Sequence, residues 1–283
     1  MIRLLCLLLP ILLLAGFVLS PADQRPVKTP SPAASPAATP VATPAVSVVI
    51  TAPSIAHPRP EYKFPTGQTF VYAAVWRIFN AGTATLRIEP AGAQDRVLGT
   101  ADTGSTASLL YKVQDHYESS FDPANFCSSS TSREIEEGLR RVSTKITFDY
   151  AKRKSIAEQK NLKKNDSRNQ EHSIPACVTD VLSGIFYAAS LPLQPGGTYS
   201  FPLNDGGETL TVIVHAEARE QLKTPAGTFN TIRVQPEAAS GLLKDKGKIW
   251  IWYSDDAARI PVQARAHMYW GMLTFTLQRI DKK

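Results

Sequence analysis

The sequence predicts a mainly β protein: a single curved antiparallel sheet, or a partly open β-barrel, with one helix covering it. Apolar and polar residues alternate along many short segments, which is the period of a half-buried strand. Turns rich in Gly and Pro, such as 195–197 and 205–207, separate several of these segments. Only one stretch, 180–190, has the spacing of an amphipathic helix. Many short strands with Gly/Pro turns are typical of sandwiches, barrels and curved sheets.

The clearest strands form a hairpin near the start of this pattern. Alternate residues from 70 to 76 are apolar, the segment 80–82 has turn chemistry, and the alternation resumes from 84 to 88. Further strands are expected at 108–113, 142–150, 209–215, 228–234, 248–253, 262–269 and 273–280. The helix at 180–190 is expected to begin after a capping Thr179 and to end before Pro192. Its apolar stripe is suited to cover one face or opening of the sheet.

Length and composition exclude several classes of protein. The chain has 283 residues, of which 43% are apolar, so it can build a sizeable core and is not wholly disordered. Only one apolar run approaches the length of a membrane span, which excludes a protein with several spans. The formal charge of +6 is mild and is not concentrated in a basic stripe, so we expect no nucleic-acid partner.

The first 22 residues have the order of an export signal. Arg3 precedes a nearly unbroken apolar run at 4–19, and small residues at 20 and 22 predict cleavage after Ala22. An uncleaved anchor is the alternative, although the run is short for a span. Phe17 stands where a lipoprotein would carry its acylated cysteine. We therefore expect an exported protein of the periplasm or cell envelope that is not lipidated.

Residues 23–60 are rich in Pro, Ala and Thr and are expected to form a disordered linker. About half of the 21 prolines lie between residues 21 and 60. Proline lacks an N–H and fixes φ, so this composition cannot form a helix or the interior of a sheet. A spacer role and plain disorder both remain open. The sequence from 61 to 283 is then expected to be a single β-rich domain.

Two cysteines, Cys127 and Cys177, remain after the signal peptide is removed. An even pair in an oxidising compartment favours a disulfide, which here would close a loop of about 50 residues. Two free thiols or a metal site are the alternatives. No Cys or His lies at zinc spacing, so we expect no metal.

No catalytic signature or cofactor motif occurs in the sequence, and the five histidines are scattered, so we expect no cofactor and assign no catalytic residue. The most distinctive string places Ser254, Asp255 and Asp256 at the end of a strand. Arg259 and Pro261 then begin the next strand. The favoured interpretation is a turn in which Ser and Asp accept backbone N–H bonds and Arg259 is an ion partner. The alternative is a paired acid/base or a cation site.

Aromatic and basic residues suggest two kinds of binding. The side chains of Trp76, Trp250, Trp252 and Tyr269 could line a cavity for an apolar ligand, although core filling is the ordinary role of such residues. The basic stretch at 152–164 could dock on anionic lipid head groups, or it could be a solvated hairpin tip, which is the commoner case.

Several motifs together resemble the exported bacterial family known as domain of unknown function 3108 (DUF3108). They occur in the family's order over about 65–280. The motifs are YAAVW at 72–76, NAGTA at 80–84, TFDY at 147–150, DVLS at 180–183, TPAGTF at 224–229, and WYSDD at 252–256 with RIPV at 259–262. The resemblance implies an exported β-rich envelope protein without an established activity. The last motif is also similar to a hairpin of periplasmic lipoprotein carriers (LolA/LolB-like half-barrels), whose curved sheet wraps a helix around an apolar cavity; this analogy concerns the fold alone.

The sequence therefore favours a non-enzymatic envelope module that binds a lipid or other apolar or amphiphilic ligand, or an envelope protein partner. Membrane contact is expected only through the signal segment, if it is uncleaved. The alternatives are a structural or assembly role in the envelope and a hydrolase that uses Asp255 and Asp256 with a histidine.

Overall fold

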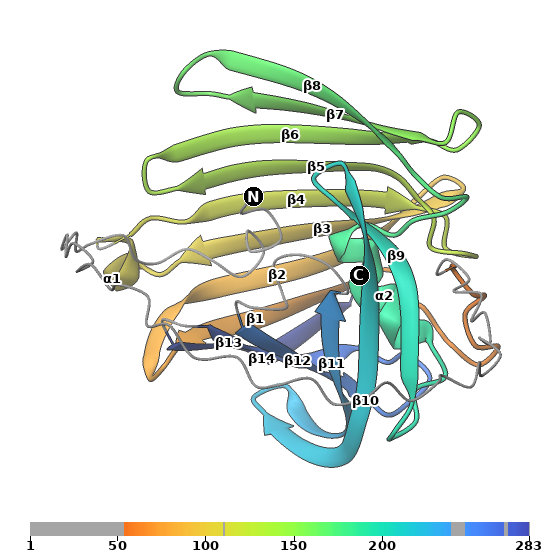
Figure 1. Cartoon of the computed structure of the whole chain (residues 1–283). Coiled ribbons are helices and arrows are strands. Elements are labelled where there is room, and N and C mark those ends of the chain that lie inside the picture. Colours follow the sequence, from red (N-terminus) through yellow and green to blue (C-terminus); the bar gives the residue numbers. More distant parts are fainter. Residues whose placement is uncertain (1–53, 110, 239–246, 269–270, 283) are drawn as a thin grey trace, which may run out of the picture. The chain divides into compact units, whose positions relative to one another are not determined.

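The computed structural model describes residues 54–109, 111–238, 247–268 and 271–282, and the statements below concern these residues. Fourteen antiparallel strands form one sheet that is not closed, accompanied by two helices (Figure 1). This confirms the predicted mainly β fold with a curved antiparallel sheet. None of the described residues belongs to a helix long and apolar enough to cross a membrane.

The elements follow one another in a regular order along the chain. They are β1 (Gln68–Trp76), β2 (Phe79–Ala91), β3 (Gln94–Thr103), α1 (Ser105–Ser108), β4 (Gln114–Phe121), β5 (Ser128–Glu137), β6 (Arg140–Asp149), β7 (Lys154–Asn161), β8 (Asp166–Ser173), α2 (Val181–Ser190), β9 (Thr198–Asp205), β10 (Glu208–Thr224), β11 (Gly227–Ala238), β12 (Gly247–Ser254), β13 (Pro261–Met268) and β14 (Gly271–Lys282). The expected strand at 108–113 is wrong, because α1 ends at Ser108 and only Val113, of the described residues that follow, forms a β-bridge, with Glu137. The first turn lies at 77–78 and not at 80–82, where Gly82 instead lets β2 pass close to Asp102.

The sheet is a meander in which almost every strand pairs with its neighbours in the chain. Its order is β8-β7-β6-β5-β4-β3-β2-β1-β14-β13-β12-β11-β10-β9, so only the β1–β14 pair joins segments distant in sequence. Because neighbouring strands are antiparallel, the connections after β1, β3, β5 and β7 lie at one end of the strands, on the left in Figure 1. The connections after β2, β4 and β6 lie at the other end.

The strands β1–β8 form one half of the sheet and the strands β9–β14 form the other. Side chains near the two ends of the strand order connect these halves. Arg133 of β5 forms an ion pair of 2.9 Å with the buried Asp205 of β9. The hydroxyl of Ser155 on β7 donates to the carbonyl of Gly207, beside β10, at 3.0 Å. The sheet is thus a partly open barrel that curls until polar side chains from its two halves touch.

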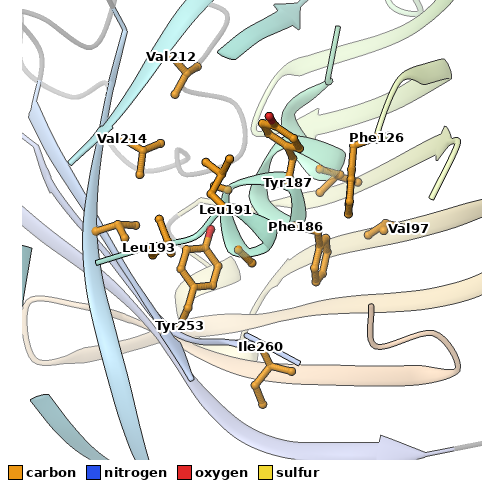
Figure 2. Packing of buried hydrophobic residues seen from close by; sticks show 14 of the residues in the cluster. Val97, Phe126, Phe186, Tyr187, Leu191, Leu193, Val212, Val214, Tyr253 and Ile260 are labelled. Atoms are coloured by element: carbon orange, nitrogen blue, oxygen red, sulfur yellow. The ribbon is translucent and has the colours of Figure 1, made fainter. Parts of the chain in front are cut away.

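Helix α2 lies in the curve of this sheet and carries much of the core. Its apolar residues pack against inner-facing residues of the strands and form one hydrophobic cluster with them (Figure 2). The cluster includes Val97, Phe126, Phe186, Tyr187, Leu191, Val212, Val214 and Tyr253. Inner-facing strand residues alternate with outer ones, so each strand supplies only every second side chain to this core.

The start of α2 is fixed by Asp180, which is almost fully buried. Its carboxylate accepts from the backbone N–H groups of Leu182 at 2.8 Å and Ser183 at 3.3 Å, which makes Asp180 the N-cap. The expectation that Thr179 caps the helix is therefore wrong. The hydroxyls of Ser119 on β4 and Ser128 on β5 also donate to the Asp180 carboxylate. One carboxylate thus satisfies the helix start and joins it to two strands.

A disulfide between Cys127 and Cys177 supports the same region, which confirms the predicted pairing. Cys127 immediately precedes β5, and Cys177 lies three residues before the helix cap. The bond spans 50 residues of sequence, so it restricts the unfolded chain and holds β5 beside the start of α2.

Residues before β1 also contact the core. The backbone N–H of Ala56 donates to the Tyr187 hydroxyl at 2.8 Å, and that of Arg59 donates to the Ser190 carbonyl at 3.1 Å. Phe64 packs edge-on against Phe186, with 5.4 Å between ring centroids. Part of the segment that the sequence assigns to the linker, 54–60, therefore makes specific contacts with α2.

We expect Asp180→Ala to lower the free energy of unfolding by about 2–4 kcal/mol, because it removes a helix cap and leaves buried donors without an acceptor. Urea unfolding with the disulfide intact measures this change. The same substitution at the exposed Asp166 is the control and should change stability by less than about 0.5 kcal/mol. Equal effects of the two substitutions would contradict the role assigned to Asp180.

Candidate functional site

An apolar cavity of about 110 Å³ lies between α2 and the inner face of the sheet. Ile185 of α2 faces strands from both halves of the sheet across this space. The larger lining residues are Tyr72, Leu86, Tyr117, Ile185, Ile251 and Phe275. The smaller ones are Ala84, Gly99, Ala101 and Ala264.

The cavity exists because small residues meet at neighbouring inner positions. Ala84 of β2 pairs with Ala101 of β3, and Leu86 pairs with Gly99 two residues further along the same strands. Elsewhere the interior is filled by aromatic rings such as Phe121, which stacks on Phe126 at 5.3 Å. The cavity is open to solvent on one side, and lining residues such as Ala84, Ala101 and Phe275 are only half-buried.

Polar groups near the cavity are engaged in the fold. The Tyr72 hydroxyl donates to the Pro261 carbonyl at 2.8 Å, and the Tyr253 hydroxyl donates to the Ile185 carbonyl at 2.7 Å. Burial raises the pKa of both phenols well above the usual value, so they stay neutral. Within the described part of the chain, no group of three His, Cys, Asp or Glu residues could hold a metal ion. Thr85 and Thr100 also line the cavity, and their hydroxyls are hydrogen-bonded to each other at 2.7 Å. This geometry is suited to holding an apolar group.

The aromatic residues singled out in the sequence lie elsewhere. Trp252 packs on the outer face of β12, where its indole N–H donates to Glu220 at 2.7 Å and the Arg265 guanidinium lies 5.3 Å from its ring centroid. Trp250 is two residues away in the same strand and therefore faces the same side. Trp76 lies at the end of β1 near Phe79. None of these three lines the cavity, and Tyr269 lies outside the described residues.

Ser254 and Asp256 organise the turn between β12 and β13. The Asp256 carboxylate accepts from the Ser254 hydroxyl at 2.8 Å, and from the backbone N–H groups of Ala258 at 3.0 Å and Arg259 at 2.9 Å. The Ser254 hydroxyl in turn accepts from the N–H of Ile260 at 2.9 Å. These are the contacts of a turn former, and Pro261 begins β13 immediately afterwards.

Asp255 is the ion partner of two arginines. It contacts Arg219 at 2.7 Å and the buried Arg259 at 3.1 Å. Burial lowers the pKa of Arg259, an effect that the nearby Asp255 charge opposes. Arg259 also has a positive φ of 46°, a strained conformation for a residue that is not glycine. The two carboxylates thus stabilise the turn. A catalytic role would require Asp255 to leave its arginines and Asp256 to leave the hydroxyl and N–H donors of the turn.

The fold divides the basic stretch noted in the sequence between the two ends of the sheet. Lys152 and Lys154 lie at the β6–β7 connection, where they pair with Asp149 at 3.0 Å and Glu171 at 2.7 Å. Lys163 and Lys164 lie at the β7–β8 connection, at the opposite end of the strands. The stretch is therefore not one continuous basic patch.

A second, polar hollow of about 420 Å³ lies over strands β1–β5. Its lining includes a cross-strand row of residues that pair in sequence, namely Thr85, Thr100, His116 and Glu134. Nearby, Arg96 pairs with Glu118 at 3.4 Å. No sequence pattern indicates this hollow, because cross-strand neighbours are determined by register.

Two carboxyl groups are buried together near one end of the sheet. Asp115 and Glu137 are both almost fully buried, and Arg140 lies 3.0 Å from Glu137. Burial, reinforced by the neighbouring Glu137, raises the pKa of Asp115 to about 7. Burial also raises the pKa of Glu137, but Arg140 opposes that rise. The pair as a whole therefore holds a proton to a higher pH than two separate carboxyl groups would.

An open antiparallel sheet that curves around one capped helix and an apolar cavity defines this protein as a β-barrel-like module. The chain belongs to the family described as "Protein of unknown function (DUF3108)", whose sequence model matches residues 71–278. This confirms the family resemblance found in the motifs. The match indicates a family of unknown function and no enzyme family. A search of curated proteins finds no match to the chain.

Several solved structures are similar to the chain. A β-barrel-like protein of the domain of unknown function DUF1849 from Brucella abortus has a TM-score of 0.48 and 8% identity, covering 76% of this chain and 97% of its own. A Bacteroides fragilis protein described as exported, with a YmcC-like fold, has a TM-score of 0.32 and 13% identity, with coverages of 78% and 98%. A Parabacteroides distasonis protein described as a lipoprotein has a TM-score of 0.31 and 9% identity, with coverages of 82% and 100%.

We expect Asp256→Ala to destabilise the protein by about 1–2 kcal/mol, because the turn donors lose their shared acceptor. Urea unfolding measures this, with Asp281→Ala as the control, since Asp281 forms only an exposed ion pair with Arg279. A variant that keeps full stability but loses a hydrolytic activity would instead support the hydrolase hypothesis.

The Asp115–Glu137 pair should make stability depend on pH. The ordinary pKa of Asp115 is 3.8 and its pKa in the folded protein is about 7. The folded state therefore binds the proton more tightly, and stability falls as the pH rises through this window. We expect Asp115→Asn to stabilise the protein by about 1–3 kcal/mol more at pH 8 than at pH 5. Thermal unfolding of both proteins in the same buffers measures this, and a difference independent of pH would contradict it.

Proposed function

We propose that the protein is a non-enzymatic, exported module of the cell envelope that binds the apolar part of an amphiphilic ligand. The ligand class is a lipid or similar molecule with an alkyl chain, and the binding site is the cavity between α2 and the sheet. The observation that carries this proposal is the apolar lining formed by Ala84, Gly99, Ala101 and Ile185 beside the aromatic core.

The volume of the cavity limits what it can hold. At about 110 Å³ it is smaller than the roughly 300–1,000 Å³ of pockets that enclose a whole drug-sized ligand. A dry apolar cavity of about 150 Å³ is large enough to bind benzene. The site therefore suits one segment of an alkyl chain, with the polar head of the molecule remaining outside.

Other roles have less support from the side chains. A hydrolase that uses Asp255 and Asp256 would need these carboxylates free, yet Asp255 binds two arginines and Asp256 accepts the turn donors. A partner protein or an assembly role would need a surface outside this cavity, whose lining is suited to an alkyl chain. The predicted signal at 1–22, with cleavage after Ala22 and no lipidation, supports the location in the periplasm or envelope. The part of the predicted linker at 23–60 that precedes residue 54 would then act as a tether.

We expect Ala101→Leu to weaken binding of cis-parinaric acid, a fluorescent fatty acid, at least tenfold, because the larger side chain occupies the cavity. Gly99→Ala should have a smaller effect, since its methyl group would lie 3.5 Å from Leu182 in ordinary contact. Fluorescence titration measures both affinities, and thermal unfolding confirms that each variant is folded.

The matched control is Ala93→Leu, which makes the same substitution at an exposed turn between β2 and β3. It should leave the affinity for the fatty acid unchanged. The proposal fails if the wild-type protein does not bind the probe, or if Ala101→Leu and Ala93→Leu bind it as tightly as the wild type.

A further inference from the structure

The large apolar side chains exposed on this protein gather at one end of the strands. Each of the five is between 59% and 85% exposed. We call them the apolar rim: Ile78, Phe79, Leu109, Leu139 and Leu162. They lie in or beside the connections that follow β1, β3, β5 and β7, at the left end of the sheet in Figure 1. No other large apolar residue of the described chain has comparable exposure.

The connections at the opposite end of the same strands have a different character. The β2–β3 turn contains Gly92 and Ala93, and the β6–β7 turn contains Ala151, Lys152 and Arg153. Single exposed apolar residues scattered over a surface are ordinary, whereas a set confined to one edge marks a site of interaction. The exposed large apolar side chains therefore lie at one end of the strands only, which chance exposure would not produce.

The spacing of the rim indicates a flat partner. Successive rim connections are two strands apart, which corresponds to roughly 10 Å between neighbouring tips. Four such connections form a row on the order of 30 Å long. Apolar side chains on separate connections can touch a flat surface together, but they do not enclose a ligand.

Cations accompany the apolar side chains. Lys160, Lys163 and Lys164 are exposed on both sides of Leu162, and none of them forms an ion pair with any described residue. At the β1–β2 turn, Arg77 lies over the ring of Trp76 at 5.3 Å, and Trp76 also contacts Phe79. Protein–protein interfaces are depleted in lysine, whereas apolar side chains flanked by Lys, Arg and Trp are typical of membrane interfaces.

We propose that the apolar rim binds the surface of a bilayer that contains anionic lipid. The connections that follow β1, β3, β5 and β7 would then face the bilayer. The rim side chains would enter the boundary between head groups and acyl chains, while the lysines beside Leu162 contact lipid phosphates. This contact involves the folded domain and is separate from any contact made by the signal segment. It does not depend on the ligand proposed for the cavity.

The test is a vesicle-binding titration of the exported protein, recovered in its processed form with the same N-terminus in every variant. The vesicles contain phosphatidylglycerol and phosphatidylethanolamine, and vesicles of phosphatidylcholine alone provide the uncharged comparison. We expect tighter binding to the anionic vesicles and at least a tenfold loss at high salt.

Two double variants test the two parts of the rim. Leu139→Ser with Leu162→Ser should weaken binding to anionic vesicles at least tenfold, as should Lys163→Glu with Lys164→Glu. The matched control is Lys152→Glu with Arg153→Glu, the same reversal of charge at the opposite end of the strands, which should change binding less than twofold. All six positions are exposed, so thermal unfolding should be nearly unaffected.

The outcomes separate this inference from the proposed function. If the wild type does not bind anionic vesicles, or if the rim and control variants lose binding equally, membrane docking is wrong. Rim variants that keep vesicle binding but lose a specific protein partner would show a protein interface instead, and would also overturn it. Ala101→Leu should retain vesicle binding, so failure of the cavity proposal leaves this inference intact.

Discussion

The buried carboxylate of Asp180 is the contact on which the arrangement of the molecule depends. It satisfies the backbone donors that begin α2, and it also accepts from Ser119 and Ser128 on two neighbouring strands. A buried charge is tolerated only when several donors surround it, so the helix cannot shift along the sheet without breaking this set of bonds. The Cys127–Cys177 disulfide fixes the same junction covalently. The position of Ile185, and hence the wall of the cavity, follows from this anchor.

A partly open sheet must bury its inner face without the closure that a barrel provides. Here α2 fills the curve with Phe186 and Tyr187, and the segment before β1 adds Phe64 to the same cluster. Arg133 and Asp205 then join the two halves of the sheet by an ion pair. Burial raises the pKa of Asp205 to about 6 despite the nearby arginine, which shows how strongly this contact is desolvated. The interior is thus covered by the packing of α2 and Phe64, and the Arg133–Asp205 ion pair joins the two halves of the sheet.

Sequence patterns predict those elements that depend on residues close together in the chain. The first strand, the amphipathic helix and the disulfide follow from alternation, helical spacing and an even number of cysteines. Strands such as β8, with the sequence DSRNQEHS, carry no apolar alternation because their inner face is not covered by the core. In β12, alternation alone cannot tell which face is inside: Ile251 and Tyr253 face the core, and the tryptophans face outward. The cavity escapes prediction for a similar reason, since it depends on Ala84 meeting Ala101 across the register.

The cavity and the rim lie toward the same end of the strands, and this relation gives the two proposals a common geometry. Ala84 and Ala101, which line the cavity, are each two residues from the Gly82–Thr103 pair, the last pair of β2 and β3 before the rim. Two residues of a strand correspond to roughly 7 Å. A protein docked by this edge would hold its apolar cavity close to the acyl region of the bilayer. The tip that carries Ile78 and Phe79 would be in the membrane, while the charged β6–β7 turn at the other end would face water. In such a docked protein, the polarity of the strand ends would orient the cavity toward the source of an alkyl ligand, which neither feature would do alone.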